Sequence, residues 1–293
     1  MKRARELAGR VVVVTGAARG IGALVARRLA ASGARVALLG LEPGELAGVS
    51  ARCGPHSRWW ELDVTDEPAL ADVAAAVREA YGQIDAVVAN AGIAIGGPFL
   101  HSDARAFARV IEVNLLGSVA TARAFLPALI DSQGYLLQVA SLAALTPAPM
   151  MAAYCASKSG VEAFADALRG EVAHHGVQVG VAYLSWTDTD MVRGADENPA
   201  LREMRAGLPF PMGRTSAIEP AAEALVRAIS RRAPRVYAQR WLPPMRLVRG
   251  VLPVAVARFA ARTMPEIESR WLATGAGTFP VGAGGAADTR TRA

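Results

Sequence analysis

Tyr154 and Lys158 are the two residues whose types and spacing could carry out acid–base chemistry. They are four residues apart, so on a helix they share one face and lie one turn from each other. A lysine ammonium beside a phenol favours the phenolate and would lower the tyrosine pKa from ~10 toward neutral pH. A tyrosine with a lowered pKa can act as a general acid or base toward a carbonyl or an alcohol. The alternative is a surface helix that carries an ordinary lysine.

The arginine-rich composition of the chain makes Lys158 more informative. Of the 32 lysines and arginines, only Lys2 and Lys158 are lysines. Because arginine is used nearly everywhere else, an interior lysine indicates a need for a compact point charge. Chemistry at this pair depends on whether the rest of the chain builds a site around it.

A glycine-rich turn joins the first predicted strand to the first predicted helix. Residues 11–14 are all valine, as in a central parallel strand, and residues 23–31 have helical apolar spacing. Glycines between them let backbone N–H groups approach a pyrophosphate, and the helix dipole stabilises that anion. The pattern predicts a dinucleotide site, with a plain glycine turn as the alternative. The residues expected at the cofactor here are Thr15, Gly16, Arg19, Gly20, Ile21 and Gly22.

The spacing of these residues, T-G-x-x-x-G-x-G, resembles the short-chain dehydrogenase/reductase family, and the resemblance extends over about residues 8–240. It implies an α/β chain with a single-domain Rossmann fold, a doubly wound parallel sheet with helices on both faces. It also implies hydride transfer between a nicotinamide and a ketone or secondary alcohol. We expect a catalytic domain over residues 1–240 with a substrate lid at about 185–216. A C-terminal helical extension over 241–272 and a disordered, Gly/Ala-rich tail over 273–293 would follow.

The family's catalytic set matches Asn114, Ser141, Tyr154 and Lys158. Ser141 precedes Tyr154 by thirteen residues, the usual interval in the family, and its hydroxyl would orient a substrate carbonyl. Tyr154 would exchange the proton, and Lys158 would lower the tyrosine pKa and hold the nicotinamide ribose. Asn114 would kink its helix and hold a water in the proton path. The alternative for Asn114 is a core residue whose amide is satisfied by backbone groups.

Further positions match the family's cofactor contacts. Asp63, followed by Val64, would accept a hydrogen bond from the adenine amine, although Asp63 could instead cap the next helix. Asn90-Ala91-Gly92 matches the turn that borders the cofactor at the carboxyl edge of the sheet. Thr189 matches a residue that contacts the carboxamide or the phosphate.

The end of the second predicted strand bears on the choice between NAD(H) and NADP(H). An acidic residue there would bind the ribose hydroxyls and an arginine would bind a 2′-phosphate, but the two positions are Gly40 and Leu41. Arg19 could reach a 2′-phosphate, whereas Glu42 would oppose one. We favour NADP(H) over NAD(H).

The segment after the sixth predicted strand departs from the family pattern. Leu184-Ser185 stands where relatives carry Pro-Gly, which affects the expected cofactor geometry more than the acid–base chemistry. Trp186 would cover the nicotinamide, line the substrate cavity or lie in a surface loop. Apolar residues of the expected lid predict a small apolar ketone or alcohol as substrate. They are Met204, Leu208, Phe210 and Met212.

Composition limits the classes of partner. The net charge of +6 is spread over single arginines, and no basic-aromatic motif for nucleic acid is present. The four histidines lack metal-ligand spacing, so no metal site is expected. Two cysteines are too few for a disulfide framework, and no run reaches the ~18 apolar residues of a membrane span. We expect a cytoplasmic protein, and the family resemblance implies a homodimer or homotetramer.

Residues 241–252 exceed the usual family length and alternate aromatic, apolar and arginine residues. Such a helix could lie on a membrane surface, with peripheral contact through residues 241–260. The interpretation we favour is an extra helix pair that packs over the substrate site or the dimer. Two further functions stay open: a dinucleotide-binding regulatory or scaffold protein without turnover, and a membrane-surface-associated reductase of lipid-like substrates.

Overall fold

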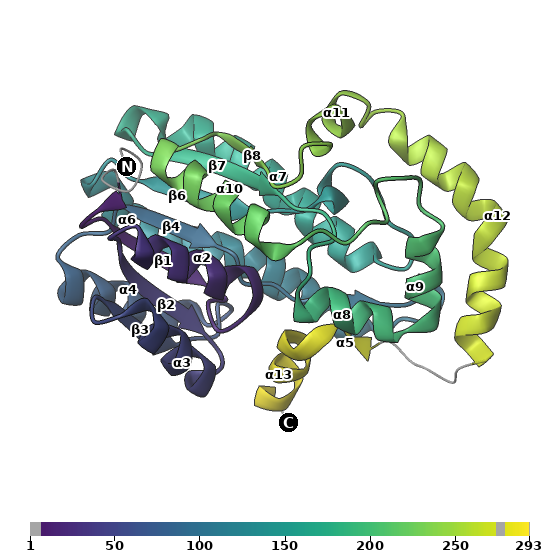
Figure 1. Ribbon diagram of the computed structural model, residues 1–293, viewed down its shortest axis with the longest axis horizontal. Helices are drawn as coiled ribbons and strands as arrows, with labels where there is room; N and C mark the ends of the chain where they lie inside the picture. The colour runs from purple at the N-terminus through teal and green to yellow at the C-terminus, as the bar shows by residue number, and fades with distance from the viewer. Residues whose placement is uncertain (1–6, 274–278, 293) are drawn as a thin grey trace.

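A seven-stranded parallel sheet runs through the middle of the protein (Figure 1). The computed structural model describes residues 7–273 and 279–292. The strand order is β3-β2-β1-β4-β6-β7-β8, so the chain moves outward from β1 and then returns to the other side of it. The strands are β1 (Val11–Thr15), β2 (Arg35–Gly40), β3 (Ser57–Glu61), β4 (Ala86–Ala89), β6 (Tyr135–Val139), β7 (Gln178–Tyr183) and β8 (Arg235–Tyr237). This order confirms the predicted doubly wound α/β fold.

Helices cover both faces of the sheet because the central strands are apolar on both faces. In β1, Val12 and Val14 belong to one core and Val11 and Val13 to the other, and all four are fully buried. The first core packs under α2 (Gly20–Ala31), α3 (Pro43–Cys53) and α10 (Ile218–Arg231). The second packs under α4 (Glu67–Tyr81), α6 (Gly117–Asp131) and α7 (Ala152–Val172).

A long helical stretch on the second face is interrupted by one wider turn. α5 (Ala104–Ile111) begins after Asp103, whose carboxylate accepts the N–H of Ala106, and it continues through a π-helical turn, η2 (Glu112–Leu116), into α6. By length and composition alone, Ala104–Asp131 could cross a membrane, because an 18-residue window within it has a mean hydropathy of 1.5. Half of this 18-residue apolar window is buried inside the protein, and α6 packs on α4. The stretch is therefore one of the helices that cover the sheet.

The segment after β7 forms a second layer beyond the carboxyl ends of the strands (Figure 1). It contains α8 (Asp190–Glu197), α9 (Pro199–Ala206) and α12 (Leu252–Ala273), whereas α11 (Leu242–Leu247) places Leu242 in the second core of the sheet. α12 runs along the end of the molecule away from β3 and packs against α9. Its buried residues Ile267 and Trp271 join the core of this layer.

The C-terminal segment differs from the disordered tail predicted over residues 273–293. β9 (Phe279–Pro280) pairs antiparallel with β5 (Ile95–Gly96), and α13 (Gly282–Arg292) packs along α8. A side chain at Gly194 would come within 2.5 Å of the backbone of Gly282, so the small residues allow this close approach. The Gly/Ala-rich composition that suggested disorder therefore serves helix packing. Residues 274–278 and 293 of the predicted tail lie outside the described residues.

Candidate active site

A cavity of about 310 Å³ opens at the carboxyl ends of the strands, at the point where the strand order reverses. It extends from Gly40, Glu42 and Asp63 at one end to Ser141 and Tyr154 at the other. Most residues predicted for the site line it, namely Gly16, Arg19, Gly20, Ile21, Asp63, Val64, Asn90, Ala91, Gly92, Ser141, Tyr154, Lys158 and Thr189. Thr15, Gly22 and Asn114 do not line it, and each of them instead supports residues that do.

Thr15 and Asn90 join the glycine turn to the loop after β4. The Thr15 hydroxyl accepts the N–H groups of Asn90 and Ala91 at 3.0 and 3.1 Å. The Asn90 amide returns hydrogen bonds to the carbonyls of Thr15 and Gly16 at 3.0 and 3.2 Å. These bonds fix two neighbouring edges of the cavity relative to each other.

The glycine turn has the geometry that a pyrophosphate requires. Gly16 has φ +62°, and a side chain there would come within 2.8 Å of the Ala91 backbone. A side chain at Gly22 would come within 2.2 Å of the Gly16 carbonyl oxygen. The first turn of α2 has neither a side-chain cap nor an acidic residue, so its N–H groups face the cavity uncapped. These residues fit the phosphates of a dinucleotide.

Ser141 follows β6 and begins a short 3-10 turn, η3 (Leu142–Ala144). Its hydroxyl accepts the N–H of Ala143 at 3.2 Å and donates to the carbonyl of Leu184 at 3.3 Å. It also lies near enough to Tyr154 to lower the tyrosine pKa. The structure therefore brings Ser141 and Tyr154 together, as their spacing predicts.

Burial dominates the protonation of Tyr154 and Lys158. It raises the pKa of Tyr154 to about 12, against the lowering effect of Ser141, and it lowers the pKa of Lys158 to about 8. The Lys158 ammonium lies 5.7 Å from the centre of the Tyr154 ring and donates to the carbonyl of Val139 at 2.9 Å. Desolvation outweighs the lowering effect of Ser141, so the pKa of Tyr154 lies above its ordinary value, whereas the sequence predicts a lowered one. Tyr154 is therefore a protonated hydroxyl at neutral pH.

Asn114 lies fully buried in the π-helical turn, where a kink is predicted. Its side-chain oxygen accepts the N–H of Ile93 at 2.8 Å, and its amide donates to the Ile93 carbonyl at 2.9 Å and to Ser157 at 3.0 Å. A side chain at Gly92 would lie 3.1 Å from the Asn114 oxygen and 3.4 Å from the Lys158 nitrogen. Asn114 thus ties the loop after β4 to α7 from behind the cavity.

Arg19 is paired with acidic residues at the other end of the cavity. Its guanidinium forms a two-bond contact with Glu42, one bond of which is 3.1 Å, and lies 3.6 Å from Asp190. The hydrogen bond to Glu42 raises the pKa of Arg19, with burial acting against it. Arg19, which could bind a 2′-phosphate, and Glu42, which would oppose one, are therefore direct partners.

The structure adds cavity residues that the sequence analysis did not name. Arg109 on α5 and Asp288 on α13 both line the cavity and are bonded to each other. An arginine on the apolar course of residues 103–130 was an available signal for Arg109, whereas nothing in the pattern near residue 288 indicates a site. Trp186 also lines the cavity, with the Arg205 guanidinium 5.3 Å from its ring centre. In the described part of the chain, no cluster of His, Cys, Asp and Glu side chains could hold a metal.

The comparison with protein families decides the assignment. The model of the short chain dehydrogenase family matches residues 10–200 of this sequence, which contain the glycine turn, Ser141, Tyr154 and Lys158. The chain belongs to the short-chain dehydrogenase family. As a short-chain dehydrogenase, it is an oxidoreductase of CH–OH and C=O groups that uses a nicotinamide dinucleotide.

Relatives of this short-chain dehydrogenase cover most of the sheet region. The 3-oxoacyl-[acyl-carrier-protein] reductase FabG of Escherichia coli is 29% identical over 74% of this chain and 88% of its own length. The dehydrogenase/reductase SDR family member 7B of Bos taurus is 34% identical over 62% of this chain, which spans 59% of that protein. A metagenomic short-chain oxidoreductase, solved in complex with NADP, is 36% identical with a TM-score of 0.58. That match covers 61% of this chain and 83% of the solved one.

Proposed function

We propose that the protein transfers a hydride between NADP(H) and a small apolar ketone or secondary alcohol, with Tyr154 as general acid and base. The observation that carries this proposal is the position of Tyr154 beside Ser141 and one helical turn from buried Lys158, at the wall of a largely apolar cavity. The apolar part of the cavity lining includes Met151, Trp186, Met191, Leu208, Met212 and Val281. Such a lining favours an apolar substrate.

In the reductive direction, bound nicotinamide would supply the hydride to the carbonyl carbon. Ser141 donates a hydrogen bond to the carbonyl oxygen and orients it toward Tyr154. Tyr154 gives its proton to that oxygen, so the C=O group becomes CH–OH. Lys158 lies close enough for its charge to stabilise the phenolate left on Tyr154 and to hold the nicotinamide ribose. Asn114 keeps the loop at Ile93 and helix α7 in register and supports the proton relay.

Tyr154→Phe tests this assignment. The variant keeps the ring and its packing but removes the proton donor, so we expect turnover to fall at least ~10³-fold while NADPH affinity stays within about twofold. Steady-state assays over a panel of apolar ketones and alcohols, with NADPH fluorescence titration, measure both. Retained turnover in the variant would contradict the role of Tyr154. Absence of wild-type turnover across the panel, with cofactor bound, would favour a dinucleotide-binding regulatory or scaffold protein.

The preference for NADP(H) over NAD(H) is part of the proposal. Arg19 lines the cavity beside Gly40 and Leu41, where a 2′-phosphate would have to be recognised. The similar metagenomic oxidoreductase was solved with NADP, which supports the same choice. Glu42 opposes it, because its carboxylate occupies the Arg19 guanidinium.

We also propose a cytoplasmic homodimer or homotetramer. Leu116 is 54% exposed on the turn between α5 and α6, on the helices through which family members associate. Light scattering of the purified protein would give the number of subunits.

A second candidate function is a membrane-surface-associated reductase of lipid-like substrates. The observation that favours it is the turn from α11 to α12, where Leu247, Val251 and Val254 are 89%, 66% and 52% exposed. No acidic residue occurs between Glu223 and Glu266, whereas arginines recur throughout this stretch. Exposed apolar side chains among arginines match an anionic lipid surface.

A further inference from the structure

The C-terminal segment returns to the cavity from the far end of the chain. Val281 donates its N–H to the carbonyl of Ala94 at 2.8 Å, directly after the pairing of β9 with β5. From there α13 runs along α8 and contributes four residues to the cavity lining. They are Val281, Gly284, Ala287 and Asp288. The segment is therefore part of the cavity wall.

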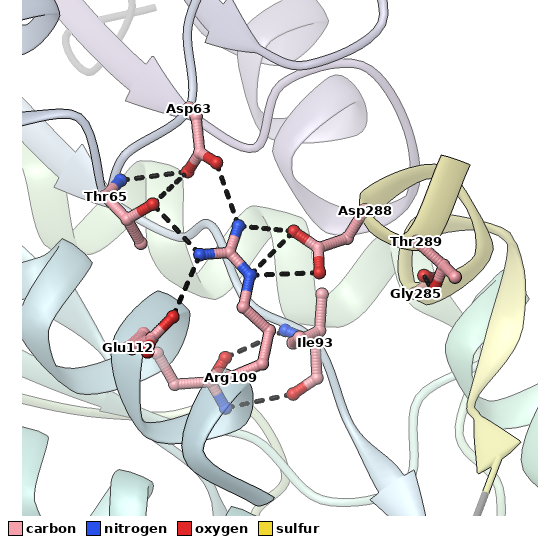
Figure 2. A network of polar contacts seen from close by, with 9 residues as sticks. Asp63, Thr65, Ile93, Arg109, Glu112, Gly285, Asp288 and Thr289 are labelled. Atoms are coloured by element: carbon pink, nitrogen blue, oxygen red, sulfur yellow. Dashed lines mark hydrogen bonds and ion pairs between the residues drawn. The ribbon is translucent and has the colours of Figure 1, made fainter. Parts of the chain in front are cut away.

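Asp288 binds the buried guanidinium of Arg109, whose side chain is only 10% exposed (Figure 2). The Nε of Arg109 lies 3.0 Å from both carboxylate oxygens of Asp288, and Nη2 donates to one of them. The side chain of Asp288 is 7% exposed, so the pair is shielded from water. Removing one partner of such a buried pair strongly destabilises the folded protein, because the remaining charge loses its compensation.

Arg109 also holds Asp63, at the end of the cavity assigned to adenine. Its Nη2 donates to Oδ2 of Asp63 at 2.9 Å, and its Nη1 donates to the Thr65 hydroxyl at 2.9 Å. Thr65 in turn donates its N–H and its hydroxyl to Oδ1 of Asp63 at 2.9 and 2.8 Å. Figure 2 shows the guanidinium between Asp63 and Asp288, with Thr65 beside Asp63. The Asp63 carboxylate is thus oriented from two sides.

These contacts also keep Asp63 ionised. Burial raises the pKa of Asp63, but the hydrogen bonds from Thr65 and the charge of Arg109 outweigh burial and hold that pKa below its usual value. An ionised carboxylate in a fixed orientation is what a hydrogen bond from an adenine amine requires. Without Asp288, the whole guanidinium charge would be free to move toward Asp63 and compete with that amine.

We propose that Asp288 is a positioning residue for the adenine end of the dinucleotide, acting through Arg109 on Asp63. The proposal rests on the proposed function, because the role of Asp63 toward adenine is part of it. It makes the C-terminal helix α13 part of the cofactor site. Asp288 shares the Arg109 guanidinium with Asp63 and so limits the strength of the ion pair between Arg109 and Asp63. The alternative is that the pair only anchors α13.

The test compares two cofactors that differ at one group of the purine. NADPH carries the adenine amine, and the reduced nicotinamide hypoxanthine dinucleotide phosphate carries an oxygen in its place. We expect the full-length wild type to prefer NADPH. Asp288→Asn should lose about tenfold in NADPH affinity but little in affinity for the hypoxanthine cofactor, since it disturbs a charged hydrogen bond to the amine. The quantity to compare is the ratio of the affinity for NADPH to the affinity for the hypoxanthine cofactor. An anchoring role would change both affinities equally or neither, so an unchanged ratio in Asp288→Asn overturns the proposal.

Matched variants separate positioning from folding. Asp63→Asn should lower this affinity ratio in the same way. Asp288→Glu keeps the carboxylate, so its ratio should stay near that of the wild type. Asp166→Asn breaks a more exposed ion pair away from the cofactor site, with Arg235 at 2.9 Å between α7 and β8, and should leave the ratio of the two affinities unchanged. If Asp288→Asn does not fold by circular dichroism, Thr65→Val removes a donor from Asp63 and must lower the ratio for the proposal to stand. A wild type that binds neither cofactor would instead refute the proposed function.

Discussion

At the scale of single residues, the ion pair of Arg19 and Glu42 affects the relative affinity for NADP(H) and NAD(H). Both side chains are partly exposed, at 28% and 19%, so their ion pair is screened by solvent. A 2′-phosphate carries more negative charge than the Glu42 carboxylate and can compete for the same guanidinium. The pair therefore weakens NADP(H) binding without excluding it.

Glu42→Gln should strengthen NADP⁺ binding by about tenfold and change NAD⁺ binding by less than threefold, because it frees Arg19 and removes an opposing charge. Isothermal titration at low salt with each cofactor measures the effect. Asp190→Asn is the matched control, since Asp190 lies farther from Arg19, at 3.6 Å, and its loss should have a smaller effect. Equal changes for NAD⁺ and NADP⁺ would show that Glu42 does not act on the 2′-phosphate.

At the scale of elements, helix α7 buries a charge that packing alone would not favour. Lys158 is 4% exposed, and its pKa of about 8 lies below the ordinary value of 10.5 because of desolvation. Between these two pH values the unfolded chain binds a proton that the folded chain has released. The free energy of unfolding should therefore rise with pH from about 8 toward 10.5. Below pH 8, α7 carries this charge at a cost of roughly 3 kcal/mol.

Lys158→Met should accordingly raise the free energy of unfolding at pH 7 by roughly 2 kcal/mol, after the lost hydrogen bond to Val139 is allowed for, while abolishing turnover. Urea unfolding at pH 7 and pH 9.5 measures this, and the rise with pH should vanish in the variant. Lys158→Arg keeps the charge at both pH values. Its free energy of unfolding should therefore not rise with pH, and it should not exceed that of the wild type at pH 7. Above pH 10 the raised pKa of Tyr154 acts in the opposite direction, so the comparison ends there. A wild-type stability that is flat from pH 8 to 9.5 would contradict the cost assigned to Lys158.

The sequence predicts the elements whose patterns are local. The valine run of β1 and the glycine turn predict their own elements, because each pattern depends on neighbouring residues. The doubly wound sheet and the pairing of Ser141 with Tyr154 were instead implied by the family resemblance. The partners of Arg109 could not be predicted, because Asp63 and Asp288 reach it from the turn after β3 and from α13, far apart in the chain. The tyrosine pKa was also inaccessible, since burial is a property of the folded cavity.

At the scale of the whole molecule, the C-terminal extension has two unlike ends. The last turns of α12 pack inward through Met264, Ile267 and Trp271, against the layer that contains α9. The sequence favours an extra helix pair over the substrate site or the dimer, and Val256, near the start of α12, lines the cavity. The turn from α11 into α12 instead exposes the apolar side chains of Leu247, Val251 and Val254.

Binding to anionic vesicles should depend on that exposed turn. We expect the full-length protein to co-sediment with vesicles that contain phosphatidylglycerol, not with pure phosphatidylcholine, and to be released by high salt, because arginines supply part of the attraction. Leu247→Ser combined with Val251→Ser should weaken the binding severalfold. Leu272→Ser is the matched control, since Leu272 is 55% exposed at the opposite end of α12, close to Glu268 in the sequence. If the double variant binds as well as the wild type, the turn does not contact lipid. A smaller particle by light scattering would then identify it as a contact between two copies of the chain.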